Sequence, residues 1–317
     1  MLMLISPSLA LADPVLWQRQ GWNTDFSKSL IEFEEILSGG PPRDGIPSID
    51  KPAFKPAKDI TDIAPTEPVI RLAYQGIVRA YPLGIMIWHE IVNDSFDSLP
   101  VVVTYCPLCN SAIAFDGRID GKAHQFGTTG KLRNSDLVMY DRQTDSWWQQ
   151  FTGRSIIGIY AGTRLNMIPV RIQSFAEFQS ENPDGDVLVP NNPGFRAYGN
   201  NPYVSYDTSK SPFLYRGTLP DNIEPMARVV VINAQTSPKA VTLEKIRNDG
   251  EILIDGVTVR WKAGVNSALD KQEISEGRDV GGVQTTTNVS GEQVDVVHDQ
   301  TFAFVFHAFH PDGEIIQ

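Results

Sequence analysis

The only two cysteines of the chain, Cys106 and Cys109, are separated by two residues in the segment 104–112. They follow an apolar, β-forming run at residues 99–103, so we expect them where a strand ends and a turn begins. Two thiols at this spacing can hold a soft metal ion, close a disulfide, or exchange between dithiol and disulfide. The chemistry of the protein is therefore expected to centre on this pair.

A metal–thiolate centre is the first hypothesis. The turn between the cysteines would point both sulfurs the same way; two thiolates with an imidazole suit Zn²⁺, and thiolates with few other ligands suit Cu(I). His89, the nearest upstream histidine, is the predicted third ligand beside Cys106 and Cys109, and His124 is a second candidate. The expected cofactor is copper or zinc, and the expected partner is a metal donor or an unknown small molecule.

Glu90, which directly follows His89, is a candidate proton carrier. The order of these residues is similar to that of zinc deaminases, in which a His and two Cys hold the zinc and a Glu moves protons. It departs from that signature because His89 and Glu90 are adjacent and because Pro107 follows the first cysteine. We therefore do not propose a deaminase. The sequence leaves open whether the protein is an enzyme, and its catalytic candidates are Glu90, Cys106 and Cys109.

Thiol–disulfide exchange is the second hypothesis. A thioredoxin-like site needs a long helix that begins at the first cysteine, whereas residues 115–121 have the pattern of a hairpin. The protein is therefore not expected to be a thioredoxin, although the pair could still be redox-active. A purely stabilising disulfide is disfavoured, because the loop that it would close is very short and contributes little entropy.

The third hypothesis is a non-catalytic ligand-binding module with a structural disulfide. Trp147 and Trp148 are candidate walls of a ligand cleft, because aromatic faces bind organic ligands. Arg133 and Arg142 lie in a turn-rich stretch of mixed charge, residues 131–142, which could orient a substrate. The alternative interpretation is that the tryptophans belong to the core and that the charged stretch forms ordinary ion pairs.

Several other kinds of site are not supported. His307 and His310 would face opposite sides of a strand at residues 302–310, which makes them a poor chelating pair. The sequence contains neither a Gly-x-Ser-x-Gly motif nor a phosphate-binding Gly-x-x-x-x-Gly-Lys-Ser/Thr motif. The net charge of -11 argues against sequence-independent nucleic-acid binding and against docking on anionic lipid. We expect no nucleic-acid partner and no membrane span.

The first residues of the chain indicate export. Residues 1–12 form an apolar run that ends in Ala-Leu-Ala, which is typical of a signal peptide and its cleavage site, although a basic beginning is missing. We interpret them as the remnant of a signal peptide and expect a periplasmic or secreted protein. Residues 13–66 are expected to form an irregular N-terminal wrap with one amphipathic helix at residues 26–37.

Composition and pattern predict a β-rich α+β fold. With 25 Gly and 22 Pro, many turns and short elements are expected, in mainly antiparallel sheets with few short helices. Four elements are predicted with definite positions: a hairpin of residues 69–74 and 77–81, a helix that begins near residue 83 and stops at 93–95, a second hairpin of 113–115 and 124–126, and a buried strand at 228–232.

Two segments of the chain repeat the same motifs in the same order. Residues 67–71 match 224–228, Asn-Asp at 93–94 matches 248–249, and Asn-Ser-Ala at 110–112 matches 266–268. Such self-similarity predicts two pseudo-repeated hairpin–helix–strand units. The first would span 67–176, the second would span 223–317, and a turn-rich connection at 177–222 would join them.

The second unit lacks the candidate site. Lys262 and Val265 stand in place of the two cysteines, and Glu244 aligns near His89. A scaffold shared by both units would not require the cysteines. Their restriction to one unit therefore favours a functional role for Cys106 and Cys109.

Five motifs also carry a family resemblance. They are Ala-Tyr-Pro-Leu at 80–83, His-Glu-Ile-Val-Asn-Asp at 89–94, Thr-Tyr-Cys-Pro-Leu-Cys at 104–109, Tyr-Asp-Arg at 140–142 and Phe-His-Pro-Asp-Gly at 309–313. With them, the chain resembles an exported bacterial family of unknown function, family 3179, that has a Tyr-Cys-Pro-Leu-Cys motif. No activity is established for that family, so the resemblance implies a family and no mechanism.

Overall fold

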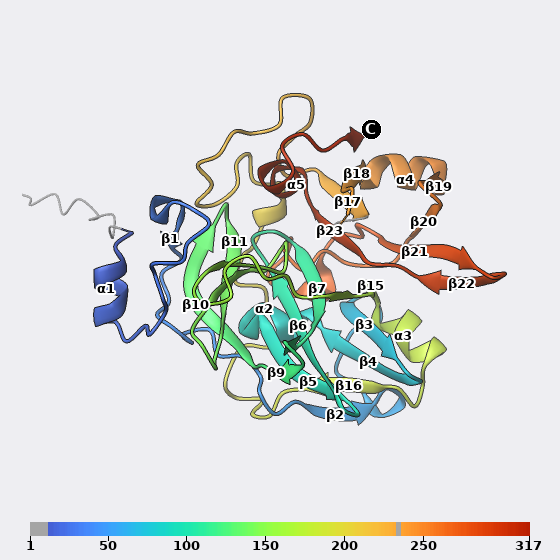
Figure 1. Cartoon of the computed structure of the whole chain (residues 1–317). Helices are drawn as coiled ribbons and strands as arrows, with labels where there is room; N and C mark the ends of the chain where they lie inside the picture. Colours follow the sequence, from blue (N-terminus) through green and yellow to red (C-terminus); the bar gives the residue numbers. More distant parts are fainter. Residues whose placement is uncertain (1–11, 233–235) are drawn as a thin grey trace, which may run out of the picture.

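The computed structural model describes residues 12–232 and 236–317, so the predicted signal-peptide remnant at 1–12 lies, apart from its last residue, outside the described residues. Within these ranges the chain is β-rich, with mostly antiparallel sheets and short helices. Five sheets of four or five strands are arranged as a five-bladed β-propeller (Figure 1). The predicted β-rich fold, with mainly antiparallel sheets and few short helices, is confirmed.

The sheet that carries the cysteines has the strand order β14–β7–β6–β5 and is antiparallel throughout. The valines at 101–103 point alternately to both faces of β6, and all three are buried, so this strand is covered on both sides. The predicted strand at 99–103 is confirmed and extends to Cys106. The four strands are β5 (Ile91–Phe96), β6 (Leu99–Cys106), β7 (Ser111–Asp116) and β14 (Met167–Ile168).

A second sheet has the order β1–β10–β11–β12–β13. Its central hairpin, β10–β11, turns through Asn134 and Ser135, whose φ angles of 53° and 66° match the two-residue turns that suit strand twist. Asp136 is therefore the first residue of β11, and it is fully buried. The strands are β1 (Leu37–Ser38), β10 (Phe126–Arg133), β11 (Asp136–Asp141), β12 (Trp147–Gln149) and β13 (Arg154–Ile157).

Three larger sheets and one small hairpin complete the strands of the described chain. One sheet has the order β15–β3–β4–β16–β2, with β2 (Ala53–Pro56), β3 (Pro68–Tyr74), β4 (Ile77–Pro82), β15 (Val170–Ser174) and β16 (Asp186–Val189). Another has the order β23–β17–β18–β24, with β17 (Arg228–Ile232), β18 (Lys239–Thr242), β23 (His298–Phe302) and β24 (Ile315–Ile316). The last comprises β19 (Glu251–Ile254), β20 (Val257–Lys262), β21 (Gly282–Val289) and β22 (Glu292–Asp295), and the small hairpin comprises β8 (Arg118–Ile119) and β9 (Lys122–Ala123).

The helices are short and connect the sheets. The α-helices are α1 (Pro14–Arg19), α2 (Leu83–His89), α3 (Phe175–Glu181), α4 (Leu243–Asp249) and α5 (Ala303–Phe309). The 3₁₀ helices are η1 (Phe33–Glu35), η2 (Ala57–Asp59), η3 (Tyr206–Thr208) and η4 (Ile274–Glu276). No helix in the described ranges has the length and apolar character needed to span a membrane.

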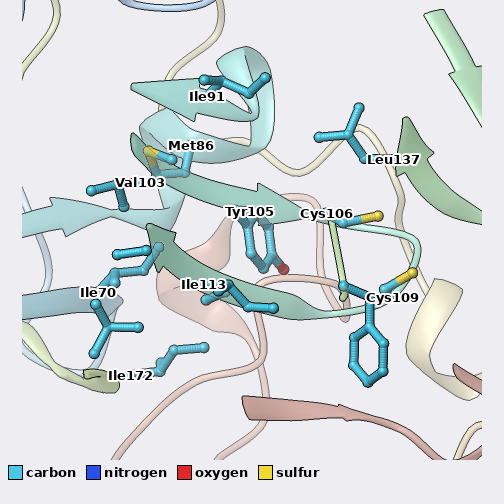
Figure 2. Close-up of a cluster of buried hydrophobic side chains, with 14 of the residues drawn as sticks. Ile70, Met86, Ile91, Val103, Tyr105, Cys106, Cys109, Ile113, Leu137 and Ile172 are labelled. Carbon is cyan, nitrogen blue, oxygen red and sulfur yellow. The ribbon is translucent and has the colours of Figure 1, made fainter. Parts of the chain in front are cut away.

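The largest hydrophobic core runs from the first hairpin through the cysteine sheet to α5. Figure 2 shows part of it, with Val103, Tyr105 and Ile113 of β6 and β7 packed together. Cys106 and Cys109 belong to the same buried cluster. The cysteine turn is thus held by the core and does not protrude from it.

The prediction of two pseudo-repeated units is wrong. The structure is a five-bladed arrangement, in which three sheets form before residue 190 and two form after residue 227. The matched segments do each fold as a hairpin followed by a helix, β3–β4–α2 and β17–β18–α4. The sequence similarity records only this local order, because distant strands such as β2 and β15 complete the sheets. The inference drawn from cysteines confined to one unit therefore loses its basis.

Two helix predictions are also wrong: one helix does not form, and another is shorter than expected. Residues 26–37 form only η1 and the short β1, because their backbone bonds to β13 instead: the amide of Leu30 donates to the carbonyl of Ile156 at 2.9 Å. The predicted helix at residue 83 is confirmed as α2, but it ends at His89. Ile91 and Asn93 lie in β5, where sheet pairing replaces the expected helical face.

The remaining local predictions are mixed. The hairpin of β3 and β4 and the strand β17 are confirmed. Residues 113–115 and 124–126 do not pair with each other, because β7 pairs with β6 and β10 pairs with β11. His307 lies in α5 and His310 caps it, so the predicted strand at 302–310 ends at Phe302.

Candidate metal centre

Cys106 and Cys109 lie at the two ends of one tight turn. Cys106 is the last residue of β6, and the amide of Cys109 donates a hydrogen bond to the carbonyl of Cys106 at 3.2 Å. Asn110 closes the turn with a positive φ of 52°, a conformation that asparagine tolerates, and β7 then begins at Ser111. Both cysteines are free thiols, and the sulfurs lie on the same side of the turn (Figure 2).

Asp136 is the third member of the cluster. One ligand atom of each side chain, Cys106, Cys109 and Asp136, lies within 4.8 Å of the other two, and all three residues are buried. The Oδ2 atom of Asp136 accepts hydrogen bonds from Gln149 Nε2 at 2.6 Å and from the Phe151 amide at 3.0 Å. Its Oδ1 atom is buried without a hydrogen-bond partner among the described residues. These three side chains therefore form a group that could hold a metal ion.

A backbone carbonyl completes the immediate surroundings of the sulfurs. The Ser135 carbonyl oxygen lies 3.9 Å from the sulfur of Cys106 and 3.6 Å from the sulfur of Cys109. The left-handed backbone of the Asn134–Ser135 turn points this carbonyl inward. One two-residue turn therefore presents both the Ser135 oxygen and the Asp136 carboxyl to the cysteines.

The thiols are protonated in this environment. Burial raises the pKa of the Cys106 thiol, and it raises the pKa of the Cys109 thiol well above its usual value. Burial also raises the pKa of Asp136 to about 6, against the opposing effect of the hydrogen bonds from the Phe151 amide and from Gln149. A positive charge at the site would favour loss of the thiol protons.

Two more buried carboxyls surround the cluster. Burial raises the pKa of Glu90 to about 8, with a further contribution from the charge of Asp136. Burial raises the pKa of Asp299, in β23, to about 7, and Asp136 again contributes. Asp299 accepts hydrogen bonds from Ser111 Oγ at 2.6 Å and from the Ala112 amide at 3.0 Å. In the part of the chain that the structure describes, none of these three carboxyls pairs with Lys or Arg.

Glu90 also has a strained backbone. It is the C-terminal cap of α2 and has a φ of 59°, a position that usually favours glycine. A glutamate there costs local stability, and such conformations concentrate at functional sites. The sequence placed Glu90 among the catalytic candidates, and the structure places its carboxyl within electrostatic reach of Asp136.

The two candidate histidines lie outside the cluster. His89 uses both ring nitrogens elsewhere: Nδ1 lies 2.7 Å from the Pro47 carbonyl and Nε2 lies 2.8 Å from the Tyr198 hydroxyl. His124 Nδ1 lies 2.9 Å from the Lys122 carbonyl. The structure therefore brings Cys106 and Cys109 together with Asp136 rather than with a histidine.

The candidate cleft residues are part of the core. Trp147 and Trp148 are both fully buried, and Trp148 Nε1 donates to the Asp141 carboxyl at 3.0 Å. Trp147 packs against two aromatic rings of the N-terminal segment, Trp17 and Trp22. Neither indole faces an open cleft.

The candidate arginines are engaged in ion pairs. Arg133 pairs with Glu35 at 2.7 Å, and Arg142 pairs with Asp44 at 3.1 Å and with Asp50 at 3.4 Å. These contacts fasten the N-terminal segment to β10 and to the end of β11. In the structure, Arg133 and Arg142 therefore hold the N-terminal segment against the sheet.

Asp136 is the site residue that sequence reasoning missed. It stands within the charged stretch 131–142, where an acidic residue reads as one of several surface charges. The available signal was its position directly after Asn134–Ser135 and before the apolar run 137–140, which puts a carboxyl at the head of a buried strand. Its proximity to the cysteines, however, depends on the packing of two separate sheets.

The fold and the cluster together define a β-propeller protein with a buried Cys/Cys/Asp site. Residues 43–313 match the model of a family described as protein of unknown function (DUF3179), and the chain belongs to this family. No curated protein and no solved structure matches the chain.

Proposed function

We propose that the protein binds a soft metal ion, zinc or copper, through Cys106, Cys109 and Asp136. The observation that carries the proposal is the buried Oδ1 atom of Asp136, which has no hydrogen-bond partner in the described chain and lies beside two sulfurs. The carbonyl of Ser135 would supply a fourth, weaker donor. The set is then two sulfurs and two oxygens.

Charge balance supports a cation at this position. Three buried carboxyls and two thiols gather here, and burial raises the pKa of every one of them. A bound cation would favour the ionised forms of its ligands and would release the thiol protons. The sequence hypothesis named His89 as third ligand; in this proposal Asp136 takes that place, because His89 is already held by Pro47 and Tyr198.

The donor set favours Zn²⁺ over Cu(I). Zinc accepts thiolate and carboxylate donors in four-coordinate sites, whereas Cu(I) is satisfied by thiolates alone. Asp136 is therefore expected to matter more for zinc than for copper. This difference separates the two metals in an experiment.

The redox hypothesis has less support. A thiol that exchanges disulfides needs a thiolate and access to solvent. Here the pKa of both thiols is raised, and the exposed fractions are 2% for Cys106 and 0% for Cys109.

We also propose that the protein is exported to the periplasm or secreted, on the basis of the apolar run at residues 1–12. N-terminal sequencing of the protein from fractionated cells tests this proposal.

The metal proposal is tested by elemental analysis of untagged, reduced protein after exposure to zinc or copper. We expect one metal ion per chain. Asp136→Asn should weaken zinc binding by at least about tenfold and copper binding less, and Cys106→Ser should weaken both. Asp141→Asn is the matched control, because it removes a buried carboxyl at the other end of β11, outside the three-residue cluster. Wild-type protein without stoichiometric metal would refute the proposal.

A further inference from the structure

A segment of the turn-rich connection crosses over the cysteine turn. We call residues 198–215 the strap; η3 lies within it. The Tyr206 hydroxyl donates to the Leu108 carbonyl, inside the cysteine turn, at 3.0 Å, and it accepts a hydrogen bond from the Phe213 amide at 3.3 Å. Ser135 Oγ donates to the Phe213 carbonyl at 2.5 Å. The strap is thus bonded to both turns that carry the donor atoms.

Two tyrosines of the strap, Tyr203 and Tyr206, are partly buried and pack against the hydrophobic core that contains Cys106 and Cys109. Burial raises the pKa of the Tyr206 hydroxyl. Burial likewise raises the pKa of Tyr203. The strap is therefore packed against the core that holds the cysteine turn, and the Tyr206 hydroxyl reaches that turn directly.

The strap is anchored at one buried carboxylate next to Tyr206. Asp207 accepts hydrogen bonds from Arg228 Nη2 at 2.9 Å, from Arg278 Nη2 at 2.7 Å and from Ser267 Oγ at 2.5 Å. Its side chain has no exposed surface, and these donors hold its pKa below the usual range against the effect of burial. Over the cysteine turn, by contrast, the strap is held by single hydrogen bonds, from Tyr206 to the Leu108 carbonyl and from Ser135 to the Phe213 carbonyl.

We propose that the strap is a gate: it closes the Cys106/Cys109 site at rest, and it opens about its fixed anchor at Asp207 when the Tyr206 hydroxyl releases the Leu108 carbonyl, which admits reactants to the sulfurs. The two sulfurs are buried, so any metal ion or donor must pass a segment that opens. The part of this inference that concerns metal entry rests on the proposed metal function. The gating of the thiols does not, because it holds equally for the metal-free protein.

The gate is tested by the rate at which a thiol reagent, 5,5′-dithiobis(2-nitrobenzoic acid), labels the reduced, metal-free chain. Tyr206→Phe keeps the ring, which packs against Phe302, and removes the hydroxyl and its two bonds. We expect labelling of this variant to become about tenfold faster, because its strap can open without breaking the hydrogen bond from the Tyr206 hydroxyl to the Leu108 carbonyl. Thr208→Val is the matched control: it removes a hydroxyl of the same helix that bonds only within the strap, to the Ser205 carbonyl.

The dependence of labelling on urea separates gating from unfolding. Opening of the strap exposes little surface, so the labelling rate should rise only slightly with low urea, whereas global unfolding gives a steep rise. Labelling that follows global unfolding in wild type, or equal rates for Tyr206→Phe and wild type, would overturn the gate. Fast zinc uptake by Tyr206→Phe supports the role in metal entry. A chain that shows gated labelling but binds no metal would refute the metal function alone.

Discussion

At the scale of single residues, burial raises the pKa of each of the three carboxyls around the cysteines. Glu90 shows this most clearly, because burial raises its pKa from 4.5 to about 8 and its backbone is left-handed as well. A protein ordinarily avoids such a residue, since Gly would relieve the backbone and an amide would avoid burial of an acid. Its presence beside Asp136 is consistent with a site that awaits a cation.

Glu90→Gln should change the pH dependence of stability in the metal-free protein. The folded state keeps the Glu90 proton up to about pH 8, whereas the unfolded state loses it near 4.5. The stability from this group is therefore full below the unfolded pKa and is lost as pH rises through the folded pKa. The amide does not titrate, so the variant should gain on wild type with rising pH, by on the order of 3 kcal/mol near pH 9.

Urea unfolding at about pH 5 and about pH 9 measures this difference. Wild type and Glu90→Gln should unfold at similar urea concentrations at the lower pH and should separate at the higher one. A separation that is the same at both pH values would show that Glu90 is not the titrating group.

At the scale of elements, β23 fastens the cysteine turn from the far side. Thr301 Oγ1 donates to the Cys109 carbonyl at 2.8 Å, and Asn110 Nδ2 donates to the Gln300 carbonyl at 3.1 Å. Asp299 binds the start of β7 through Ser111 and Ala112. The turn is thus fixed by side chains that lie about 190 residues away along the chain.

Ser111→Ala should lower the free energy of unfolding by about 1.5–3 kcal/mol, because it leaves the buried Asp299 carboxyl without its hydroxyl donor. Ser155→Ala is the control: this serine is also buried, but it donates to the neutral backbone carbonyl of Trp147 at 3.3 Å, so its loss should cost about 1 kcal/mol. Urea unfolding near neutral pH compares the two variants. Equal losses would indicate that the bond to Asp299 has no special weight.

Short sequence patterns correctly predicted the elements whose structure depends mainly on neighbouring residues. The run of valines before Cys106 specifies a buried strand, and the Gln75–Gly76 turn between two alternating segments specifies a hairpin; both predictions hold. The predicted helix at 26–37 does not form, because the backbone of that segment hydrogen-bonds to β13 and Phe26 packs against Trp147. Tertiary contacts override helical periodicity there.

Only part of the site could be predicted from the sequence, because the rest depends on tertiary contacts. The cysteine pair is a local motif and was found from its spacing. Asp136 reaches it from another sheet, and no spacing in the sequence records that approach. His89 was chosen as the nearest histidine along the chain, whereas its ring points to Pro47 and Tyr198.

At the scale of the whole molecule, the N-terminal segment is part of the fold. β1 pairs with β10 and β2 pairs with β16, so residues before the first hairpin extend two of the five sheets. Trp17, Trp22 and Phe26 pack against Trp147 of β12 in a separate aromatic cluster. Detachment of this segment would expose the outer face of the sheet that carries Asp136.

Arg43 links the N-terminal segment to the sheet that carries Asp136. Its guanidinium makes two hydrogen bonds to the Asp145 carboxyl, at 2.7 Å and 3.1 Å, and it stacks on the rings of Trp22 and Tyr140 with centroid distances of 4.4 Å and 4.2 Å. Asp145 is largely buried, so loss of Arg43 leaves a carboxylate without its counter-charge. Arg43→Ala should therefore lower the free energy of unfolding by about 3 kcal/mol.

The matched control for Arg43 is Arg118→Ala, which breaks an exposed pair with Asp116 in a small surface hairpin and should leave the stability unchanged. Urea unfolding followed by tryptophan fluorescence reads out both variants, because three of the indoles lie in the cluster that Arg43 closes. Arg43→Lys should fall between wild type and Arg43→Ala, since an ammonium keeps the charge but not the two-bond geometry or the stacking. If Arg43→Ala were as stable as Arg118→Ala, the N-terminal segment would be held by its aromatic rings alone.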